Sequence, residues 1–268
     1  MLSTALLSAL LVPSLATSRP LPAPAPVPAV AGKVAAEKVE FKTDDKLVLS
    51  ADYYAPKQSK KSSSRAPAAI LVHDAGSDRS TMALVAERLH GKGLAVLAVD
   101  LRGHGDSRDK DNDWSKLDGK VRDRQWAYAS RDLEAAAAWL KTRSEVHSAN
   151  LTMVGFRAGC ALSVYHAARD DKVRAVVLIE PANEQLGFDL SRECAELAGL
   201  ETKVFTPKDK VDEAKIIQAS ATKANDGLEF IEVALCKSKG EELIHDRRVA
   251  SDVAKWVSDR VFPKKGRR

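Results

Sequence analysis

Short apolar runs alternate with amphipathic stretches along most of the chain, and this alternation constrains the fold more than any other feature. Residues 68–72 and 94–99 are apolar throughout, and residues 173–179 are apolar except for Arg174, as strands buried on both faces of a sheet require. Residues 131–143 instead place apolar side chains on one helical stripe. The pattern predicts an α/β fold with a doubly wound, mostly parallel sheet and helices on both faces.

The first extended segments have a different pattern. Residues 39–42 and 47–54 flank the turn Asp44-Asp45-Lys46, and the second segment alternates apolar and polar side chains. Two such runs joined by a short polar turn are typical of an antiparallel hairpin. We therefore expect antiparallel strands at the N-terminal edge of the sheet.

Composition limits the classes of partner. With 44% hydrophobic and 29% charged side chains over 268 residues, the chain can bury one sizeable core. Part of the formal charge of +5 lies in the basic tail, residues 263–268. Aromatic residues make up only 5% of the chain and are not interleaved with basic runs, so we expect no nucleic-acid partner. The oligomeric state cannot be read from these features.

The N-terminus differs from the rest. Residues 2–16 are apolar but short for a bilayer span, and Ala16-Thr17-Ser18 resembles a signal cleavage site. We expect a signal peptide over residues 1–18, a Pro/Ala-rich spacer over 19–33 and the folded domain over 34–262. These features predict export to a periplasmic or extracellular location, with no stable membrane span once the signal is removed.

Four segments lie where strands are expected to end, in the order 73–77 (HDAGS), 100–107 (DLRGHGDS), 154–159 (VGFRAG) and 237–244 (KSKGEELI). The first is similar to the oxyanion loop of α/β-hydrolases, and the second resembles their Asp-x-Arg-Gly-His-Gly-x-Ser signature. The third lies where that family carries its nucleophile elbow, and the fourth where it usually carries a His-Gly segment. The chain thus resembles the small carboxylesterase, dienelactone-hydrolase-like or serine-aminopeptidase-like branch, which implies an α/β-hydrolase fold.

The elbow-like segment lacks a nucleophile. Gly155 and Gly159 match the two elbow glycines, which permit close backbone approach on either side of a strained residue. The residue between them is Arg157, whose guanidinium stays protonated and cannot attack a carbonyl. Ordinary serine-hydrolase chemistry is therefore not expected.

The other triad positions are altered as well. Aligning Leu243 and Ile244 with the apolar pair that follows the family's catalytic histidine puts Lys239 in the position of the base. A protonated lysine cannot accept a serine proton. The resemblance makes Asp209 the candidate acid.

Two interpretations of this altered site remain open. If Arg157, Asp209 and Lys239 converge beside inward-facing backbone N–H groups of Asp74 and Ala158, the site suits a small anion such as a carboxylate or phosphate. Alternatively, an Arg157–Asp209 pair fills a disused site.

Cys160 is an alternative nucleophile, because a thiolate near a helix N-terminus can be activated. His245 is its possible base if the last loop has another register. The competing interpretation is that Cys160, Cys194 and Cys236 are small buried hydrophobes, since they do not form a disulfide framework or a metal motif.

The remaining candidates favour structural roles. His104 resembles the family's structural histidine, and His73 is expected to stabilise the oxyanion loop. Trp114 and Trp126 flank a charged stretch that is interpreted either as a short lid or as a solvated loop anchored by these two aromatic residues. No motif predicts a cofactor or a metal ion.

Three functions therefore compete. The first is a non-catalytic pseudo-hydrolase that binds a small, possibly anionic ligand or a partner. The second is an active hydrolase that uses non-standard groups such as Cys160. The third is a structural or interaction protein with a closed pocket.

Overall fold

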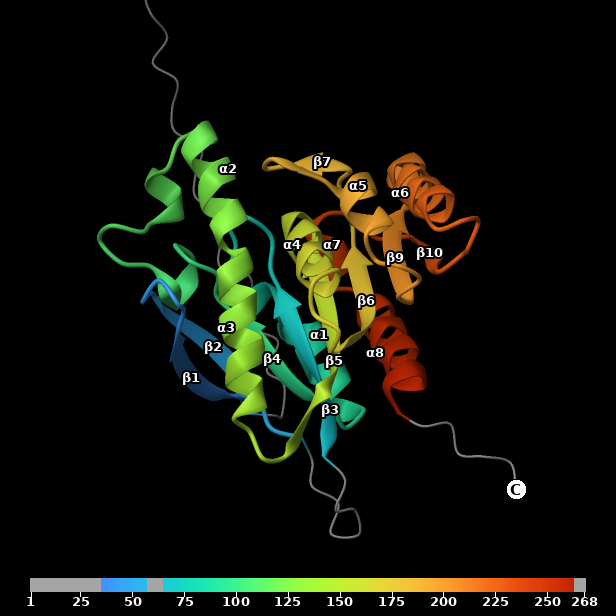
Figure 1. Ribbon diagram of the computed structural model, residues 1–268. Coiled ribbons are helices and arrows are strands. Elements are labelled where there is room, and N and C mark those ends of the chain that lie inside the picture. The colour runs from blue at the N-terminus through green and yellow to red at the C-terminus, as the bar shows by residue number, and fades with distance from the viewer. Residues whose placement is uncertain (1–34, 57–64, 263–268) are drawn as a thin grey trace, which may run out of the picture. The chain divides into compact units, whose positions relative to one another are not determined.

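The computed structural model describes residues 35–56 and 65–262 (Figure 1). The expected signal peptide, spacer and basic tail lie outside these residues. The main sheet consists of β1 (Glu37–Lys42), β2 (Val48–Tyr54), β3 (Ala66–Val72), β4 (Ala95–Val99), β5 (Val146–Phe156), β6 (Val173–Ile179), β9 (Thr202–Pro207) and β10 (Ile231–Cys236). The α-helices are α1 (Ala83–Gly91), α2 (Gly119–Tyr128), α3 (Ser130–Lys141), α4 (Ala158–Ala167), α5 (Leu190–Ala195), α6 (Val211–Ala224), α7 (Glu241–Ile244) and α8 (Arg247–Val261).

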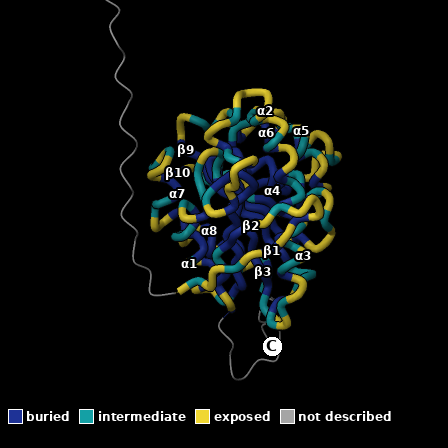
Figure 2. The backbone as a smooth tube through the Cα atoms, turned by 90° about the vertical axis from the view of Figure 1, so that its left-hand side faces the viewer, coloured by how far each residue is buried: buried dark blue, intermediate teal, exposed yellow. Residues whose placement is uncertain are grey.

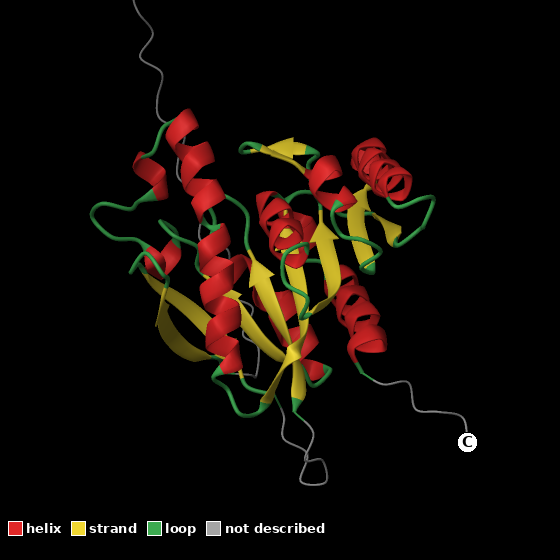
Figure 3. Ribbon diagram, viewed as in Figure 1, coloured by secondary structure: helices red, strands yellow, loops and turns green. Residues whose placement is uncertain are grey.

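The eight strands form one sheet in the order β1-β2-β4-β3-β5-β6-β9-β10. Figure 3 shows the strands of this sheet with helices around them. β1 and β2 pair in antiparallel fashion, and β2 is antiparallel to β4, whereas the pairs from β4 to β10 are parallel. The expected hairpin and its position at the sheet edge are therefore confirmed. The parallel strands also bring their carboxyl ends, and the loops that follow them, to one edge of the sheet.

Helices cover both faces of the sheet, as the alternation predicts. Ile70 and Val72 pack in one cluster with apolar side chains of α3, α4 and α6. Leu71, between them in the sequence, points the other way and packs with side chains of α1 and α8. Figure 2 shows the buried backbone concentrated between these layers.

The segment from Asp100 to Ser107 is held by buried hydrogen bonds. The Asp100 carboxylate accepts the backbone N–H of Arg79 at 2.7 Å and that of Asp106 at 2.7 Å. Ser107 Oγ accepts the backbone N–H of Ser50 at 2.8 Å and donates to the Asp100 carbonyl at 2.7 Å. The motif that resembles a family signature therefore fixes a loop by joining it to β2 and to the start of the first helical segment.

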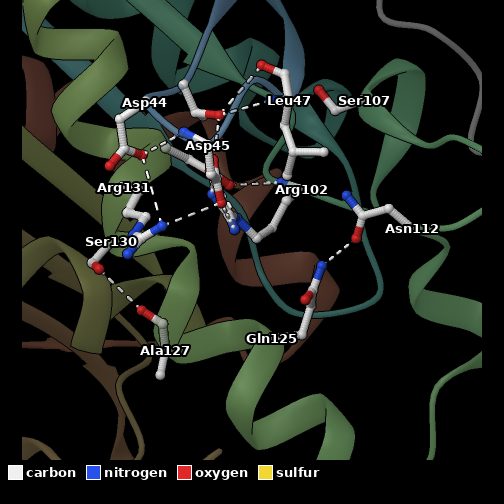
Figure 4. Close-up of polar contacts among 12 residues, drawn as sticks. Asp44, Asp45, Leu47, Arg102, Ser107, Asn112, Gln125, Ala127, Ser130 and Arg131 are labelled. Carbon is white, nitrogen blue, oxygen red and sulfur yellow. Dashed lines mark hydrogen bonds and ion pairs between the residues drawn. The ribbon is translucent and has the colours of Figure 1, made fainter.

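Arg102 from the same motif makes a second set of hydrogen bonds that hold this part of the structure together (Figure 4). Its guanidinium donates to the fully buried Asp132 at 2.7 Å and to Asp45 in the hairpin turn at 2.9 Å. Such charge-assisted, multidentate contacts are stronger than neutral hydrogen bonds. They fix the β1–β2 turn against α3.

The stretch between Trp114 and Trp126 is anchored by its two aromatic residues, as the loop interpretation expects, but it is not a loop throughout. Its second half forms α2 instead of a solvated loop, and both indoles are buried. The Trp114 ring lies 4.7 Å from the His104 ring and 5.5 Å from the Trp126 ring. Aromatic packing on His104 thus anchors this segment. No helix among the described residues is long and apolar enough to cross a membrane.

Candidate functional site

The turn from β5 into α4 has elbow geometry, and Arg157 lies at its apex. Arg157 adopts φ 47° and ψ −114°, a conformation that costs a non-glycine residue about 1–3 kcal/mol. A Cβ on Gly155 would lie 2.5 Å from the Gly159 carbonyl oxygen, and a Cβ on Gly159 would lie 2.5 Å from that of His73. Both glycines are therefore required by the backbone, and the predicted elbow position is where the structure places it.

The Arg157 side chain is surrounded by carboxylates. Its Nη1 lies 3.3 Å from Glu241 Oε1 and 3.5 Å from Asp74 Oδ2, and its Nε lies 3.5 Å from Glu180 Oε2. The structure therefore corrects the expected Arg157–Asp209 pair. Arg157 is neutralised by three carboxylates from other loops, because these loops gather at the same edge of the sheet.

The Asp74 carboxylate occupies the place of an oxyanion. Its Oδ1 accepts the backbone N–H of Ala158 at 3.1 Å and that of Ala75 at 2.9 Å. In an active hydrolase of this fold, the backbone N–H of the residue after the nucleophile stabilises the negatively charged oxygen of the tetrahedral intermediate. The expectation that the Ala158 N–H is available to a ligand is therefore wrong, since the chain's own carboxylate uses it.

Burial and hydrogen bonding act on Asp74 in opposite directions. Desolvation raises the pKa of its carboxyl group, while the Ala158 N–H and the Arg157 guanidinium oppose that rise by stabilising the charged form. The same two groups would stabilise a negatively charged intermediate. In this protein both groups already interact with the Asp74 carboxylate, the first by a hydrogen bond and the second by an ion pair.

Glu180 lies directly after β6 and was not singled out from the sequence. It has φ 51° and is only 3% exposed. Its Oε1 lies 2.9 Å from Lys210 Nζ, and its Oε2, on the side of Arg157, has no hydrogen-bond partner among the described residues. A buried carboxylate between two cations is a stable arrangement only while those cations remain.

The expected acid and base positions are neighbours. Lys239 Nζ lies 3.6 Å from Asp209 Oδ2, and both side chains are more than half exposed. The next residue, Gly240, lies against Arg157, because a Cβ there would be 3.3 Å from Arg157 Nη2. The loop after β10 thus reaches the elbow, and Lys239 itself pairs with the acid position instead of with Arg157.

An open pocket of about 400 Å³ lies beside the elbow. The residues that line it are Glu180, Asp209, Lys210, Lys239, Gly240, Glu241 and Glu242. Sequence analysis associated five of them with the site, either singly or through the segment 237–244: Asp209, Lys239, Gly240, Glu241 and Glu242. Glu180 and Lys210 were missed, although a charged residue directly after a buried parallel strand, such as Glu180, is a usable signal.

The model of the dienelactone hydrolase family matches residues 52–219, which is more than half of the chain. The chain belongs to the dienelactone hydrolase family. This family member also matches the uncharacterized proteins MT2364 and Rv2307c of two Mycobacterium tuberculosis strains, with 28% identity over 130 residues. Each match covers 48% of this chain and only 40% of the relative's length.

Solved structures support the same fold for this dienelactone hydrolase family member. The Pyrococcus furiosus esterase Pf2001 is similar with a TM-score of 0.67 and 17% identity, over 88% of this chain and 97% of that esterase. A cold-adapted esterase from an Arctic intertidal metagenomic library gives a TM-score of 0.65 and 15% identity, over 87% and 99%. These comparisons confirm the α/β-hydrolase fold.

Cys160 of this dienelactone hydrolase family member is enclosed in the core. Its side chain is fully buried in α4, and its Sγ lies 3.3 Å from the Gly155 carbonyl oxygen, to which the thiol donates. Burial raises the pKa of the thiol well above its ordinary value. His245 lies between α7 and α8. These features describe a packed thiol.

The two motif histidines hold the loops around the elbow. His73 Nε2 accepts the backbone N–H of Leu101 at 3.1 Å, and His104 Nε2 accepts that of Gly76 at 3.0 Å. Both rings must be neutral to accept these bonds. Desolvation lowers the pKa of each ring to about 4.

These histidines predict a loss of stability on acidification. Between about pH 6.5 and pH 4 the unfolded chain binds protons that the folded chain excludes, so the free energy of unfolding falls as the pH falls, by up to about 3 kcal/mol for each ring. Urea unfolding at about pH 7 and about pH 5 measures this loss. The wild type is expected to lose more stability than a His104→Gln variant.

The contribution of Asp132 to the pH dependence does not disturb the comparison of the wild type with His104→Gln. Burial raises the pKa of Asp132 to about 6, which acts with the opposite sign, but this contribution is the same in the wild type and the variant and cancels in the difference. Equal slopes for wild type and His104→Gln would contradict the assignment of a neutral buried ring.

Proposed function

We propose that this member of the dienelactone hydrolase family is non-catalytic at its elbow and acts by binding instead of by acyl transfer. One observation carries the proposal: the Ala158 N–H that would stabilise an oxyanion is bonded to Asp74 at 3.1 Å, beside an arginine at the nucleophile position. Acyl transfer needs both an attacking group and donors for the developing charge. Both requirements fail at the same turn.

The arrangement of charges argues against the small anion that the sequence suggested as a ligand. Arg157, the group that would bind a carboxylate or phosphate, already faces Asp74, Glu180 and Glu241. An added anion would compete with these residues and would be repelled by them. We therefore propose binding at this site without an anionic headgroup.

The burial of the Cys160 thiol argues against the alternative of an active hydrolase that uses this cysteine as its nucleophile. A cysteine nucleophile requires a thiolate that a substrate can reach. Cys160 is fully buried and its pKa is raised, so neither condition is met. A structural or interaction protein with a closed site remains a second candidate, which the mutual neutralisation of Arg157 and its carboxylates favours.

A screen of ester substrates tests the proposal. Hydrolysis of short activated esters and of a dienelactone by wild type is expected to equal that of the Arg157→Ala and Cys160→Ala variants. Equal rates indicate background reaction at the protein surface. A rate that disappears in Cys160→Ala would support the active-hydrolase alternative, and one that disappears in Arg157→Ala would place catalysis at the elbow.

A further inference from the structure

The strand β10 ends the main sheet on the side opposite to β1, and its outer edge carries free backbone groups (Figure 1). The Thr202 N–H donates to the Phe230 carbonyl at 2.9 Å, so even-numbered residues here direct their backbone groups toward β9. Odd-numbered residues of β10 therefore direct theirs outward. Gln218 Nε2 donates to the outward carbonyl of Ile231 at 2.7 Å, which confirms this direction. Among the described residues, no strand pairs with this outer side of β10.

The two edges of the sheet are protected unequally against pairing with another strand. β1 has charged side chains at four of its six positions, which discourages such pairing. β10 has one charged residue, Glu232, whose carboxylate is already paired with Lys203 and Arg260. On the other face of β10, Leu235 is 54% exposed, and the pairing of β10 with β9 has no register shift. An apolar, regular and unprotected edge is suited to the addition of a strand.

The sequence around β10 is complementary to itself in antiparallel orientation. Glu229 precedes the strand and Lys237 follows it, and both are exposed and form no ion pair with any described residue. A two-fold axis at Val233 places Glu229 of one copy opposite Lys237 of the other, and does so twice. The same register places Leu235 opposite Ile231, whereas moving the axis by one residue breaks the Glu229–Lys237 pair. Charge and apolar pattern therefore select a second copy of this chain as the added strand.

We propose that the outer edge of β10 pairs with the same edge of a second copy, antiparallel about Val233, so that one sheet continues across a dimer. The Val233 N–H of each copy donates to the Val233 carbonyl of the other. The Leu235 N–H donates to the Ile231 carbonyl, whose oxygen has a second lone pair beside the bond from Gln218. The inference is independent of the proposed function, because it uses no group of the elbow.

The mass of the full chain in solution tests this inference. Sedimentation at increasing protein concentration is expected to show the wild type shift from monomer to dimer. Val233→Pro removes the central outward N–H without removing a bond to β9, so the variant should fold and its dimer should dissociate about tenfold or more readily. A wild type that stays monomeric, or a Val233→Pro dimer of unchanged affinity, would overturn the inference.

Charge reversal gives a result that loss of structure does not produce. Lys237→Glu and Glu229→Lys each place like charges opposite each other twice, and each should weaken the dimer about tenfold. The two substitutions combined should restore the wild-type affinity. Lys120→Glu on α2 makes the same charge change at an exposed position away from β10 and should leave the dimer unchanged. Failure of the combined variant to regain affinity would contradict the proposed register.

Cysteine cross-linking tests the position of the two-fold axis. In the proposed dimer the two copies of residue 233 face each other with Cα atoms about 5.5 Å apart, within the reach of a disulfide. The two copies of residue 229 lie eight residues apart along the strands, which is about 27 Å. Mild oxidation should therefore link Val233→Cys into a covalent dimer and leave its matched control, Glu229→Cys, unlinked, since the native cysteines are buried. The reverse result, or no cross-link in either variant, would overturn the inference.

Discussion

A variant with Arg157→Ser, Lys239→His and Asp74→Gly is expected to hydrolyse activated esters, whereas the variant without the Asp74 substitution stays near background. The first two substitutions supply an attacking oxygen at the elbow and an imidazole next to Asp209, whose carboxylate lies 3.6 Å from Lys239 Nζ. The third frees the Ala158 N–H for the developing negative charge. Removing one such donor typically lowers turnover about 10²- to 10³-fold, so the triple variant should exceed the double by about that factor.

The double variant is the matched control for this experiment, and Asp74→Gly alone should remain inactive. Replacing Arg157 removes one of the two cations that pair with the buried Glu180, which could destabilise the fold. Thermal unfolding of each variant therefore checks that it still folds. Equal activity of double and triple variants would show that Asp74 does not block the site. A folded triple variant without activity would show that more than these side chains has been lost.

The second large effect concerns the elbow glycines. Gly159→Ala is expected to lower the free energy of unfolding by about 3 kcal/mol or more, because the new Cβ would collide with the Val72 and His73 carbonyl oxygens, which are fixed in and after β3. Backbone atoms of a central strand cannot move aside without loss of sheet hydrogen bonds. Denaturant unfolding measures the change.

Gly91→Ala is the control for this substitution. Gly91 ends α1 and has open space where a Cβ would lie, so the change should be neutral or stabilising by up to about 1 kcal/mol. A Gly159→Ala variant as stable as Gly91→Ala would mean that α4 does not approach β3 as closely as the structure shows. The elbow geometry would then need revision.

The sequence predicted the architecture well because the signals were local. Continuous apolar runs identified β3, β4 and β6, and the turn at Asp44 to Lys46 identified the antiparallel edge. The two glycines around Arg157 located the elbow, because a close backbone approach leaves few alternatives to glycine. These features depend on residues that are neighbours along the chain.

The charge environment of the site was harder to predict. Glu180 and Lys210 follow different strands and meet only because β6 and β9 pair in register. The Asp74 side chain likewise meets the Ala158 N–H across the β3–β5 pair, so its role as a stand-in for the oxyanion was not visible. The helical part of the stretch between Trp114 and Trp126, α2, could not be predicted, because its charged residues obscure the one buried position, Trp126.

Covalent labelling of the wild-type protein tests the central claim most directly. The protein is incubated with a fluorophosphonate or with an activated ester, and its intact mass is then measured by mass spectrometry. The variant with Arg157→Ser, Lys239→His and Asp74→Gly, the triple variant, serves as the positive control. With Arg157 at the elbow and Asp74 on the Ala158 N–H, we predict no stoichiometric adduct on wild type under conditions that label the triple variant at position 157. A stoichiometric acyl or phosphonyl adduct on a wild-type residue at this site would contradict the account.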